Sequence, residues 1–243
     1  MTRVAIIAAM PGELKPLVQS WQHERRNGVD LWRWKTAEAE WVAACAGAGV
    51  GAATRAFAEV ERDGAVSSVF SIGWAGALTD EVEAGQTYWV SGVVDAQTGE
   101  RFRPAVWDKE CWLVTSPKVA DEPEKRRLAA AYGAELVDME AAAIARLAAM
   151  RQIQFFCLKG VSDGLKDRLP DFNRFISDDG QFKLPLFILF ILIRPWYWPA
   201  LMRMGENSRK AALGMKERLL EHLKRNYEQG ALTNRNGDPD FRR

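Results

Sequence analysis

The stretch that decides the fold is Leu136–Asp167, LVDMEAAAIARLAAMRQIQFFCLKGVSDGLKD. Its first half predicts a helix that starts at Asp138, carries Glu140 in its first turn and continues to Met150. This segment is rich in alanine and nearly free of charge, and a helix that is apolar almost all round is typically buried. The carboxylate of Glu140 is therefore expected at the start of a buried helix.

The second half of the stretch predicts a strand. The apolar run Ile153–Leu158 has the length and character of a buried strand in a parallel sheet. Lys159 follows near its end, and Gly160–Gly164 is expected to be a loop that carries Asp163. Two carboxylates, Glu140 and Asp163, thus lie at the ends of elements that otherwise avoid charge. The alternative interpretation is that they are only a helix-start charge and a turn residue.

Length and composition set the broad class of the protein. A chain of 243 residues is most simply one large domain with a substantial core. The formal net charge of +1 gives no electrostatic reason to expect nucleic-acid binding. The segment after Met1 is expected to be a first strand and not a signal peptide, because its apolar run is too short.

Cysteine and histidine usage narrows the chemistry. Three cysteines in apolar settings favour a reducing cytoplasm over a disulfide framework, and no CxxC spacing suggests a zinc site. His23 and His222 lack a Ser or Cys partner pattern. Proton transfers in an enzyme of this sequence would therefore fall to Asp and Glu, without a metal or cofactor.

Strands and helices are expected to alternate along the chain. Strands are predicted at residues 4–9, 31–35, 40–45, 66–72, 85–94 and 112–116, and helices at 14–21, from the turn 47–52 to about 62, and at 122–132. The charged helix 122–132 is expected to be exposed. This alternation predicts an α/β fold: one three-layer domain with a central mixed, mostly parallel twisted sheet flanked by helices.

Glu13 lies where the first strand meets the following helix, after Met10-Pro11-Gly12. A carboxylate at such a junction of an α/β sheet points toward the crevice where ligands bind. The alternative is that Glu13 only stabilises a helix N-terminus through the helix dipole.

Two glycine-rich segments follow. Gly47–Ala52 matches the G-x-G-x-x-A dinucleotide pattern, but the next strand ends in Gly73-Trp74-Ala75-Gly76, without the acidic residue that would hold a ribose. We therefore favour a tight turn over a nicotinamide site for Gly47–Ala52. The second segment, Gly73–Leu78, is expected to be a turn whose backbone N–H groups line a pocket walled by Trp74.

In this order the motifs resemble the purine nucleoside phosphorylase and 5′-methylthioadenosine/S-adenosylhomocysteine nucleosidase superfamily. The resemblance covers roughly residues 3–167 and rests on five segments, which are Val4–Met10 with Glu13, Gly47–Gly51, Gly73–Leu78, Val137–Ala143 and Val161–Asp163.

The resemblance implies cleavage of the N-glycosidic bond of a purine nucleoside of adenosine type, through an oxocarbenium-like transition state. It assigns Asp163 as the acid toward the purine and Glu13 as the base that activates water, in line with the general chemistry of glycosidic cleavage. Asp163 would need a raised pKa, which a closed apolar pocket would supply. Glu140 would bind the ribose hydroxyls. Further substrate contacts are assigned to Met139, Ser162, Gly73, Trp74, Ala75 and Gly76.

Three positions qualify this transfer. Asp138 stands where family members often carry Glu, and Trp74 replaces a small or hydroxylated residue. Lys159 occupies a position that is usually basic, and we expect it to pair with a buried carboxylate in a structural role.

We predict hydrolysis because phosphate binding lacks its residues. The hexameric phosphorylases carry an Arg where this chain has Ser71, and Glu13 would repel a phosphate dianion. Phosphorolysis remains the alternative, and a non-catalytic nucleoside-binding protein is the alternative of another class.

The segment Leu184–Met204, LPLFILFILIRPWYWPALMRM, is too short to span a bilayer as one helix. It has three interpretations: a core or subunit-interface helix, a lid over an apolar substrate group, or a peripheral membrane contact. Its Pro- and Leu-rich composition is similar to that of the phosphorylase-like proteins associated with hopanoid synthesis, which implies an adenosyl-lipid substrate.

The rest of the chain carries no further domain in this interpretation. Ser208–Tyr227 predicts a basic amphipathic helix that packs on the domain, and residues 230–243 predict a flexible tail. The expected protein is a cytoplasmic homodimer or higher homo-oligomer, peripheral at the membrane if Leu184–Met204 contacts lipid.

Overall fold

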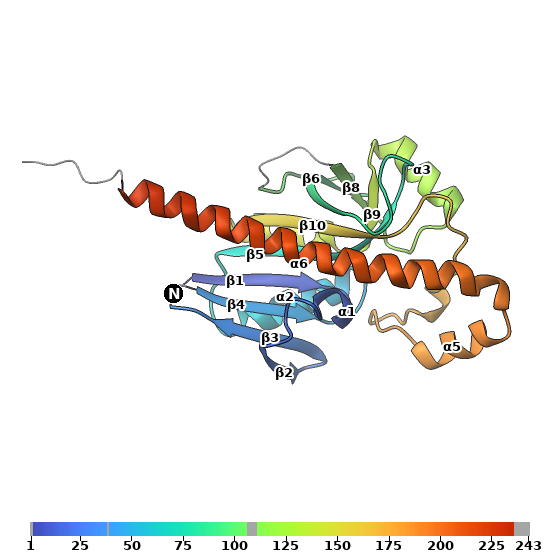
Figure 1. Cartoon of the computed structure of the whole chain (residues 1–243), viewed down its shortest axis with the longest axis horizontal. Coiled ribbons are helices and arrows are strands. Elements are labelled where there is room, and N and C mark those ends of the chain that lie inside the picture. Colours follow the sequence, from blue (N-terminus) through green and yellow to red (C-terminus); the bar gives the residue numbers. More distant parts are fainter. Residues whose placement is uncertain (1, 38, 106–110, 236–243) are drawn as a thin grey trace, which may run out of the picture.

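Ten strands of the chain join in one mixed sheet (Figure 1). The computed structural model describes residues 2–37, 39–105 and 111–235, with side chains through Lys224. The strands are β1 (Thr2–Ala8), β2 (Gln22–Arg26), β3 (Val29–Lys35), β4 (Ala39–Cys45), β5 (Ser68–Ala77), β6 (Thr87–Asp95), β7 (Arg101–Phe102), β8 (Cys111–Thr115), β9 (Leu136–Asp138) and β10 (Gln154–Asp163).

The sheet combines a parallel centre with antiparallel extensions. Strands β4, β1, β5 and β10 are parallel neighbours in that order. Strands β5, β10, β6, β8 and β9 close into a ring, because β10 pairs with both β5 and β6 while β9 pairs back onto β5. The antiparallel strands β2 and β3 extend the other side. The predicted mixed, mostly parallel sheet is confirmed.

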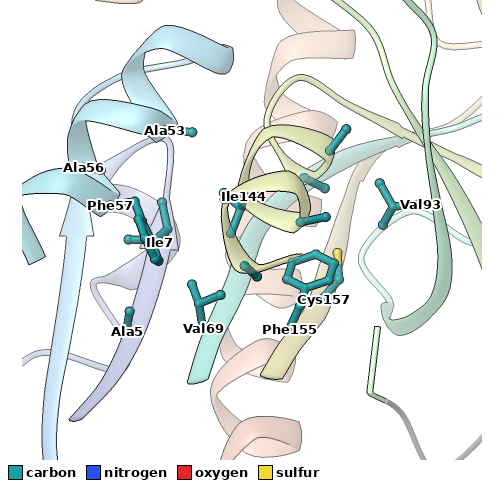
Figure 2. Packing of buried hydrophobic residues seen from close by; sticks show 14 of the residues in the cluster. Ala5, Ile7, Ala53, Ala56, Phe57, Val69, Val93, Ile144, Phe155 and Cys157 are labelled. Carbon is teal, nitrogen blue, oxygen red and sulfur yellow. The ribbon is translucent and has the colours of Figure 1, made fainter. Parts of the chain in front are cut away.

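Helices cover both faces of the sheet. They are α1 (Pro11–Leu14), α2 (Val50–Glu61), α3 (Glu122–Tyr132), α4 (Ala141–Arg151), η1 (Phe172–Phe175), α5 (Leu184–Leu192), η2 (Pro195–Tyr197) and α6 (Trp198–Arg235). On one face, Phe57 of α2 packs near Ile7 and Ile144 of α4 packs near Val69 (Figure 2). On the other face, α6 buries a stripe of apolar residues against β1, β5 and β10.

Two segments that were predicted to be loops form β-strand instead. The turn expected at Gly73–Leu78 and the loop expected at Gly160–Gly164 were wrong, because β5 continues to Ala77 and β10 continues to Asp163. The two segments pair with each other in parallel, from Lys159 opposite Gly73 to Asp163 opposite Gly76. Glycine disfavours strands in isolation, but here each segment gains backbone partners from the other.

The segment after β1 also differs from its prediction. The helix expected over residues 14–21 is absent, and the short helix α1 ends at Leu14. Pro16 provides the reason, since it has no N–H to donate and its ring disfavours a continued helix. After a turn, residues 22–26 form β2, a strand that the sequence pattern did not indicate because it has no apolar residue.

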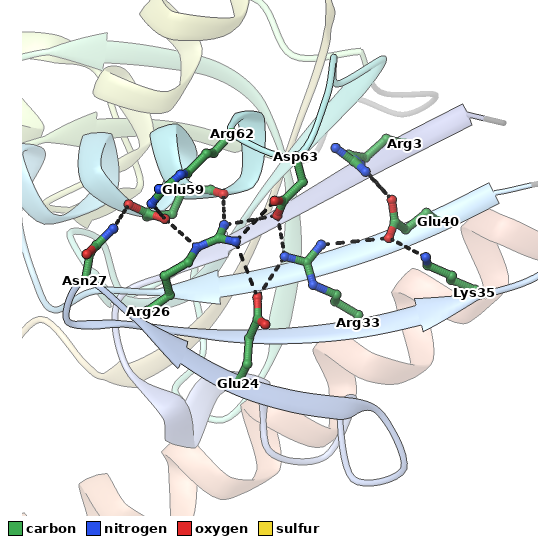
Figure 3. A network of polar contacts seen from close by, with 10 residues as sticks. All are labelled: Arg3, Glu24, Arg26, Asn27, Arg33, Lys35, Glu40, Glu59, Arg62 and Asp63. Atoms are coloured by element: carbon green, nitrogen blue, oxygen red, sulfur yellow. Dashed lines mark hydrogen bonds and ion pairs between the residues drawn. The ribbon is translucent and has the colours of Figure 1, made fainter.

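An ion-pair network explains why a charged strand is stable at this edge (Figure 3). Arg26 of β2 contacts Glu59 of α2 at 2.7 Å and Asp63 at 3.0 Å. Arg33 of β3 contacts the same Asp63 at 2.5 Å. The two guanidinium groups lower the pKa of Asp63 to about 2. The network ties β2 and β3 to the end of α2.

The C-terminal third departs most from its prediction. The expected basic helix packs on the domain through Ala211, Ala212, Met215 and Leu219, but α6 is longer, since it starts at Trp198 and extends through Arg235. The remainder of the predicted tail, residues 236–243, lies outside the described residues. Among those described, no single helix is long and apolar enough to cross a membrane. Only α5 together with the segment Pro195–Lys224 would pass that test, as a pair bent by 106°.

Candidate active site

The side chain of Glu13 is held by backbone N–H groups from two strand ends. Its Oε2 atom accepts hydrogen bonds from the N–H groups of Ala9 at 2.8 Å and Met10 at 2.7 Å. Its Oε1 atom accepts one from the N–H of Trp74 at 2.7 Å. Glu13 is buried, and this burial raises the pKa of its carboxyl group, although the three backbone donors and the charge of Lys159 oppose the shift.

Two glycines provide the space for this arrangement. A Cβ atom at Gly73 would lie 2.7 Å from Oε1 of Glu13, too close for any side chain. A Cβ atom at Gly12 would lie 2.9 Å from the indole of Trp74. The indole Nε1 of Trp74 donates to the carbonyl of Ser208 in α6, 3.1 Å away. Trp74 therefore anchors α6 as well as presenting its N–H to Glu13.

Glu140 is the N-cap residue of α4 and reaches the first glycine-rich loop. Its Oε1 atom accepts a hydrogen bond of 2.6 Å from the N–H of Gly49. Burial and the neighbouring charge of Asp138 raise the pKa of Glu140 to about 8, and Glu13 adds to the shift while Lys159 and Gly49 oppose it. The predicted helix start at Asp138 was early, since Asp138 ends β9 and α4 begins at Ala141.

Asp138 and Lys159 form a fully buried ion pair beneath these carboxylates. The Nζ atom of Lys159 lies 2.9 Å from Oδ2 of Asp138 and 3.1 Å from Oγ of Ser71. Asp138 also accepts hydrogen bonds from the hydroxyl of Thr115 at 2.7 Å and the N–H of Ala141 at 2.9 Å. The predicted pairing of Lys159 with a buried carboxylate is confirmed. The Asp138 carboxylate is therefore buried and bound to partners within the protein.

Asp163 has an unexpected cationic partner. The Nζ atom of Lys125 lies 2.5 Å from Oδ2 of Asp163 and 2.7 Å from the carbonyl oxygen of Gly164. The hydroxyl of Ser162 donates to Oδ1 of Asp163 at 2.5 Å. An ammonium group at this distance stabilises the ionised carboxylate. This polar setting differs from the apolar pocket that the sequence led us to expect around Asp163.

Gly76 makes room for the pair of Lys125 and Asp163. A Cβ atom at Gly76 would meet Cε of Lys125 at 3.2 Å and Oδ2 of Asp163 at 3.3 Å. Since Gly73 borders Glu13 and Gly76 borders Asp163, one stretch of β5 runs past both carboxylates. This part of β5 therefore passes both carboxylates as a strand and not as the predicted turn.

Lys125 is the site residue that sequence reasoning missed. The helix α3 was expected to be exposed, but Lys125 and Leu128 are buried. Their spacing of three residues places both on one helix face, and this was the available signal. It was hidden because Lys125 stands among Glu122, Glu124, Arg126 and Arg127, which form surface ion pairs on the same helix.

The other predicted contact residues lie beside these groups. The side chain of Met139 lies next to Gly49, since a Cβ atom at Gly49 would be 4.0 Å from its Cε. Ser162 is buried and also lies 3.3 Å from the carbonyl of Ala75. In the part of the chain that the structure describes, no group of three or more His, Cys, Asp or Glu side chains is arranged to hold a metal ion.

The buried lysines of this region are paired with carboxylates of the protein. Lys159 pairs with Asp138, and Lys125 pairs with Asp163. Both ammonium groups are therefore already offset by a neighbouring carboxylate, and this arrangement disfavours the binding of a dianion.

Comparison with known proteins agrees with this fold. The model of the phosphorylase superfamily matches residues 3–118 and 114–182. The sequence matches no curated protein. Among solved structures, 5′-methylthioadenosine/S-adenosylhomocysteine nucleosidase of Helicobacter pylori is similar at a TM-score of 0.69 with 14% identity, over 93% of this chain and 98% of that chain.

Two further structures are similar over their whole length. The corresponding nucleosidase of Neisseria meningitidis has a TM-score of 0.69 and 18% identity, over 92% of this chain and 99% of that chain. Futalosine hydrolase of Helicobacter pylori has a TM-score of 0.67 and 14% identity, over 90% and 96% respectively. At these identities the likeness concerns the fold. Because the family model covers most of the sequence, the chain belongs to the phosphorylase superfamily.

Proposed function

We propose that this protein hydrolyses the N-glycosidic bond of a purine nucleoside of adenosine type, with water as the nucleophile. The observation that carries the proposal is the set of hydrogen bonds that holds the Glu13 carboxylate. The N–H groups of Ala9, Met10 and Trp74 all donate to the Glu13 carboxylate. A carboxylate has about four acceptor positions, so one is left for the water that Glu13 would activate.

The same three donors argue against phosphorolysis. Converging backbone N–H groups are the kind of site that binds a phosphate oxygen. Here a carboxylate of the protein itself occupies them, and its charge would repel a phosphate dianion. Glu13 would thus both block the anion and serve as a base, and the burial that raises its pKa makes it a stronger base.

Glu140 would hold the sugar. Its Oε1 atom is fixed by Gly49, and its Oε2 atom makes a weaker contact of 3.3 Å with the N–H of Met139. Hydroxyl groups of a ribose would therefore bind chiefly to Oε2. The carboxyl groups of Glu140 and Glu13 lie close enough to affect each other's charge. The hydrogen bonds between the ribose hydroxyls and Glu140 would strengthen as the ribosyl group develops positive charge and the base leaves.

Asp163 would serve the leaving base, with Lys125 as the source of the proton. The Lys125 ammonium group lies within hydrogen-bond distance of Oδ2 of Asp163 and could pass a proton to it. Substrate binding would exclude water, and the low dielectric that results disfavours two separate charges. A proton would then move from Nζ of Lys125 to Oδ2 of Asp163. It would pass from Oδ2 to N7 of the purine as the bond between C1′ and N9 breaks.

Incubation with a nucleoside panel, with and without phosphate, tests the reaction. The panel would contain adenosine, 5′-methylthioadenosine, S-adenosylhomocysteine and a 5′-alkyl adenosine, with inosine as the 6-oxo control. From the adenosine derivatives we expect free adenine and the corresponding free ribose with its 5′ substituent retained, at a rate that phosphate does not change. Strict dependence on phosphate, with formation of a ribose 1-phosphate, would establish phosphorolysis instead. Binding of the nucleosides without release of base would indicate a non-catalytic binding protein.

A further inference from the structure

Helix α5 is apolar on every side but packs against the protein on one side only. Phe187, Phe190, Ile191 and Arg194 form a half-buried stripe at helical spacing. The opposite side is equally apolar and faces outward, and no residue of α5 is buried. Leu189 is 63% exposed and Leu192 is 60% exposed. Helix α5 is therefore not a core helix of this chain, and that interpretation is wrong.

The exposed surface continues beyond α5 into η2 and the start of α6. Ile193, Trp196, Trp198 and Met202 are all exposed, and Trp196 is 67% exposed. We call residues 184–202 the apolar tip. It contains most of the exposed large apolar side chains in the described part of the chain. A contiguous apolar surface of this kind marks a binding site.

We propose that the apolar tip docks in the interfacial region of a lipid bilayer that contains anionic lipids. The polar backbone groups at the end of α5 provide the first argument. The carbonyl of Phe190 accepts a hydrogen bond of 3.0 Å from the guanidinium of Arg194, and the carbonyl of Ile191 accepts one of 2.9 Å from the indole of Trp198. These carbonyls would be hydrated at a solvated helix end, whereas an apolar medium requires partners from the protein.

Backbone groups at the beginning of α5 also have partners within the protein. The N–H of Lys183 donates to the carbonyl of Phe175 at 2.7 Å, and the N–H of Leu184 donates to the carbonyl of Phe182 at 2.9 Å. Pro185 has no N–H that needs a partner. Each of these internal hydrogen bonds lowers the cost of placing this short helix among lipid chains.

Charge and aromatic content favour a membrane surface over a protein partner. Between Lys183 and Arg209 the sequence has four basic residues and a single acidic one, Glu206. Arg203 keeps only a long contact of 3.7 Å with Asp167. In the sequence, Trp196 and Trp198 lie between α5 and Arg203. Tryptophan together with arginine or lysine at such a boundary suits the headgroup region of a bilayer with anionic lipids.

The geometry fits a helix that lies in the interface and does not cross the membrane. The axis bends by 106° between α5 and the following helical segment. Helix α5 also has only nine residues, about half of what a membrane span requires. The tip would therefore insert as a shallow wedge.

The apolar tip is fixed to the part of the chain that carries the proposed active site. The ring of Phe187 in α5 packs against those of Phe172, Phe175 and Phe182 in tilted or edge-to-face contacts, with ring centroids 5.3 to 5.4 Å apart. The turn that precedes α5 rests on the first glycine-rich loop, where the N–H of Ala48 donates to Gly180 at 2.8 Å. That loop also holds Glu140 through Gly49. Docking would thus set the orientation of the site relative to the membrane.

Flotation of the full-length protein with phosphatidylcholine vesicles, with and without phosphatidylglycerol, tests the proposal. We expect the wild-type protein to float with the anionic vesicles, and the bound fraction to fall at least tenfold in the double variant Leu189→Glu, Leu192→Glu. These side chains face outward, so the variant should keep the wild-type melting temperature. The matched control, Met150→Glu with Leu213→Glu, changes exposed apolar residues elsewhere and should bind like the wild type.

Two further measurements separate lipid from a second copy of the chain. Brominated lipids should quench the fluorescence of the wild-type protein more than that of the variant Trp196→Phe, Trp198→Phe. Sedimentation without vesicles should give the same oligomeric state for the wild type and the Leu189→Glu, Leu192→Glu variant. The proposal is overturned if the wild type does not float, or if the double variant dissociates an oligomer that covers the tip. Neither result depends on the nucleosidase activity.

Discussion

The Nζ atom of Lys125 in α3 lies 2.5 Å from Oδ2 of Asp163 at the end of β10, and both residues are buried. The two residues are 38 positions apart in the sequence. The space between them exists because Gly76 of β5 has no side chain. The pair joins a helix with a charged outer surface to the carboxylate proposed to act on the leaving base.

Replacing Lys125 with Met should lower kcat by about 10²- to 10⁴-fold, the range typical for loss of a proton-transfer group, with little change in KM. Arg should keep the charge pairing and part of the stability but not turnover, because a guanidinium does not give up its proton. The unpaired buried carboxylate should also destabilise the protein by roughly 3–5 kcal/mol, measured by urea unfolding. Adding Asp163→Asn should recover stability but not activity. If the double variant also recovers turnover, the proposed relay is wrong.

Glu140 should make the stability of the protein depend on pH. Its pKa is near 4.5 when unfolded and about 8 in the folded protein. Between these values the folded state holds a proton that the unfolded chain has released, so stability should fall as pH rises from about 4.5 to about 8 and then level off. Urea midpoints across this window should show a smaller slope for Glu140→Gln. An unchanged slope would contradict the raised pKa.

Glu13→Gln tests the base and its backbone donors together. An amide cannot take a proton from water, and its NH₂ group would face an N–H of Ala9, Met10 or Trp74. We expect a fall in kcat of about 10²-fold or more and a loss of roughly 1–3 kcal/mol in stability. Glu81→Gln, at an exposed position, is the control. Phosphate should not rescue Glu13→Gln, and rescue by phosphate would reveal a concealed phosphorylase site.

Gly76→Ala should disturb the Lys125 and Asp163 pair without changing either residue. The added methyl group would lie 3.2 Å from Lys125 and 3.3 Å from Asp163, so both side chains must shift by a few tenths of an ångström. We expect reduced kcat in a folded protein. The matched control is Gly205→Ala in α6, where no atom lies within 4 Å and a helix gains about 0.5–1 kcal/mol. Equal activity in the two variants would show that the pair has no part in turnover.

Local signals in the sequence determined much of the secondary structure. The bounds of α3 agree with the prediction, because Asp121 caps its N-terminus, Pro123 stands in its first turn and Gly133 ends it in a left-handed conformation. The predicted strands 31–35 and 40–45 correspond to β3 and β4, and the predicted buried helix corresponds to α4. The apolar residues of these segments indicated their burial. The residues Glu13, Glu140 and Asp163 could be singled out as isolated carboxylates.

Only the tertiary structure decided how these carboxylates are held. The glycine-rich segments of β5 and β10 become strands because each pairs with the other, a contact between residues more than 80 positions apart that no local pattern contains. Lys125 enters the site for the same reason, since its partner lies on a distant strand. Whether α5 is buried also depended on what packs beside it. Local sequence set which carboxylates stand out as candidates, and long-range packing set which charges they meet.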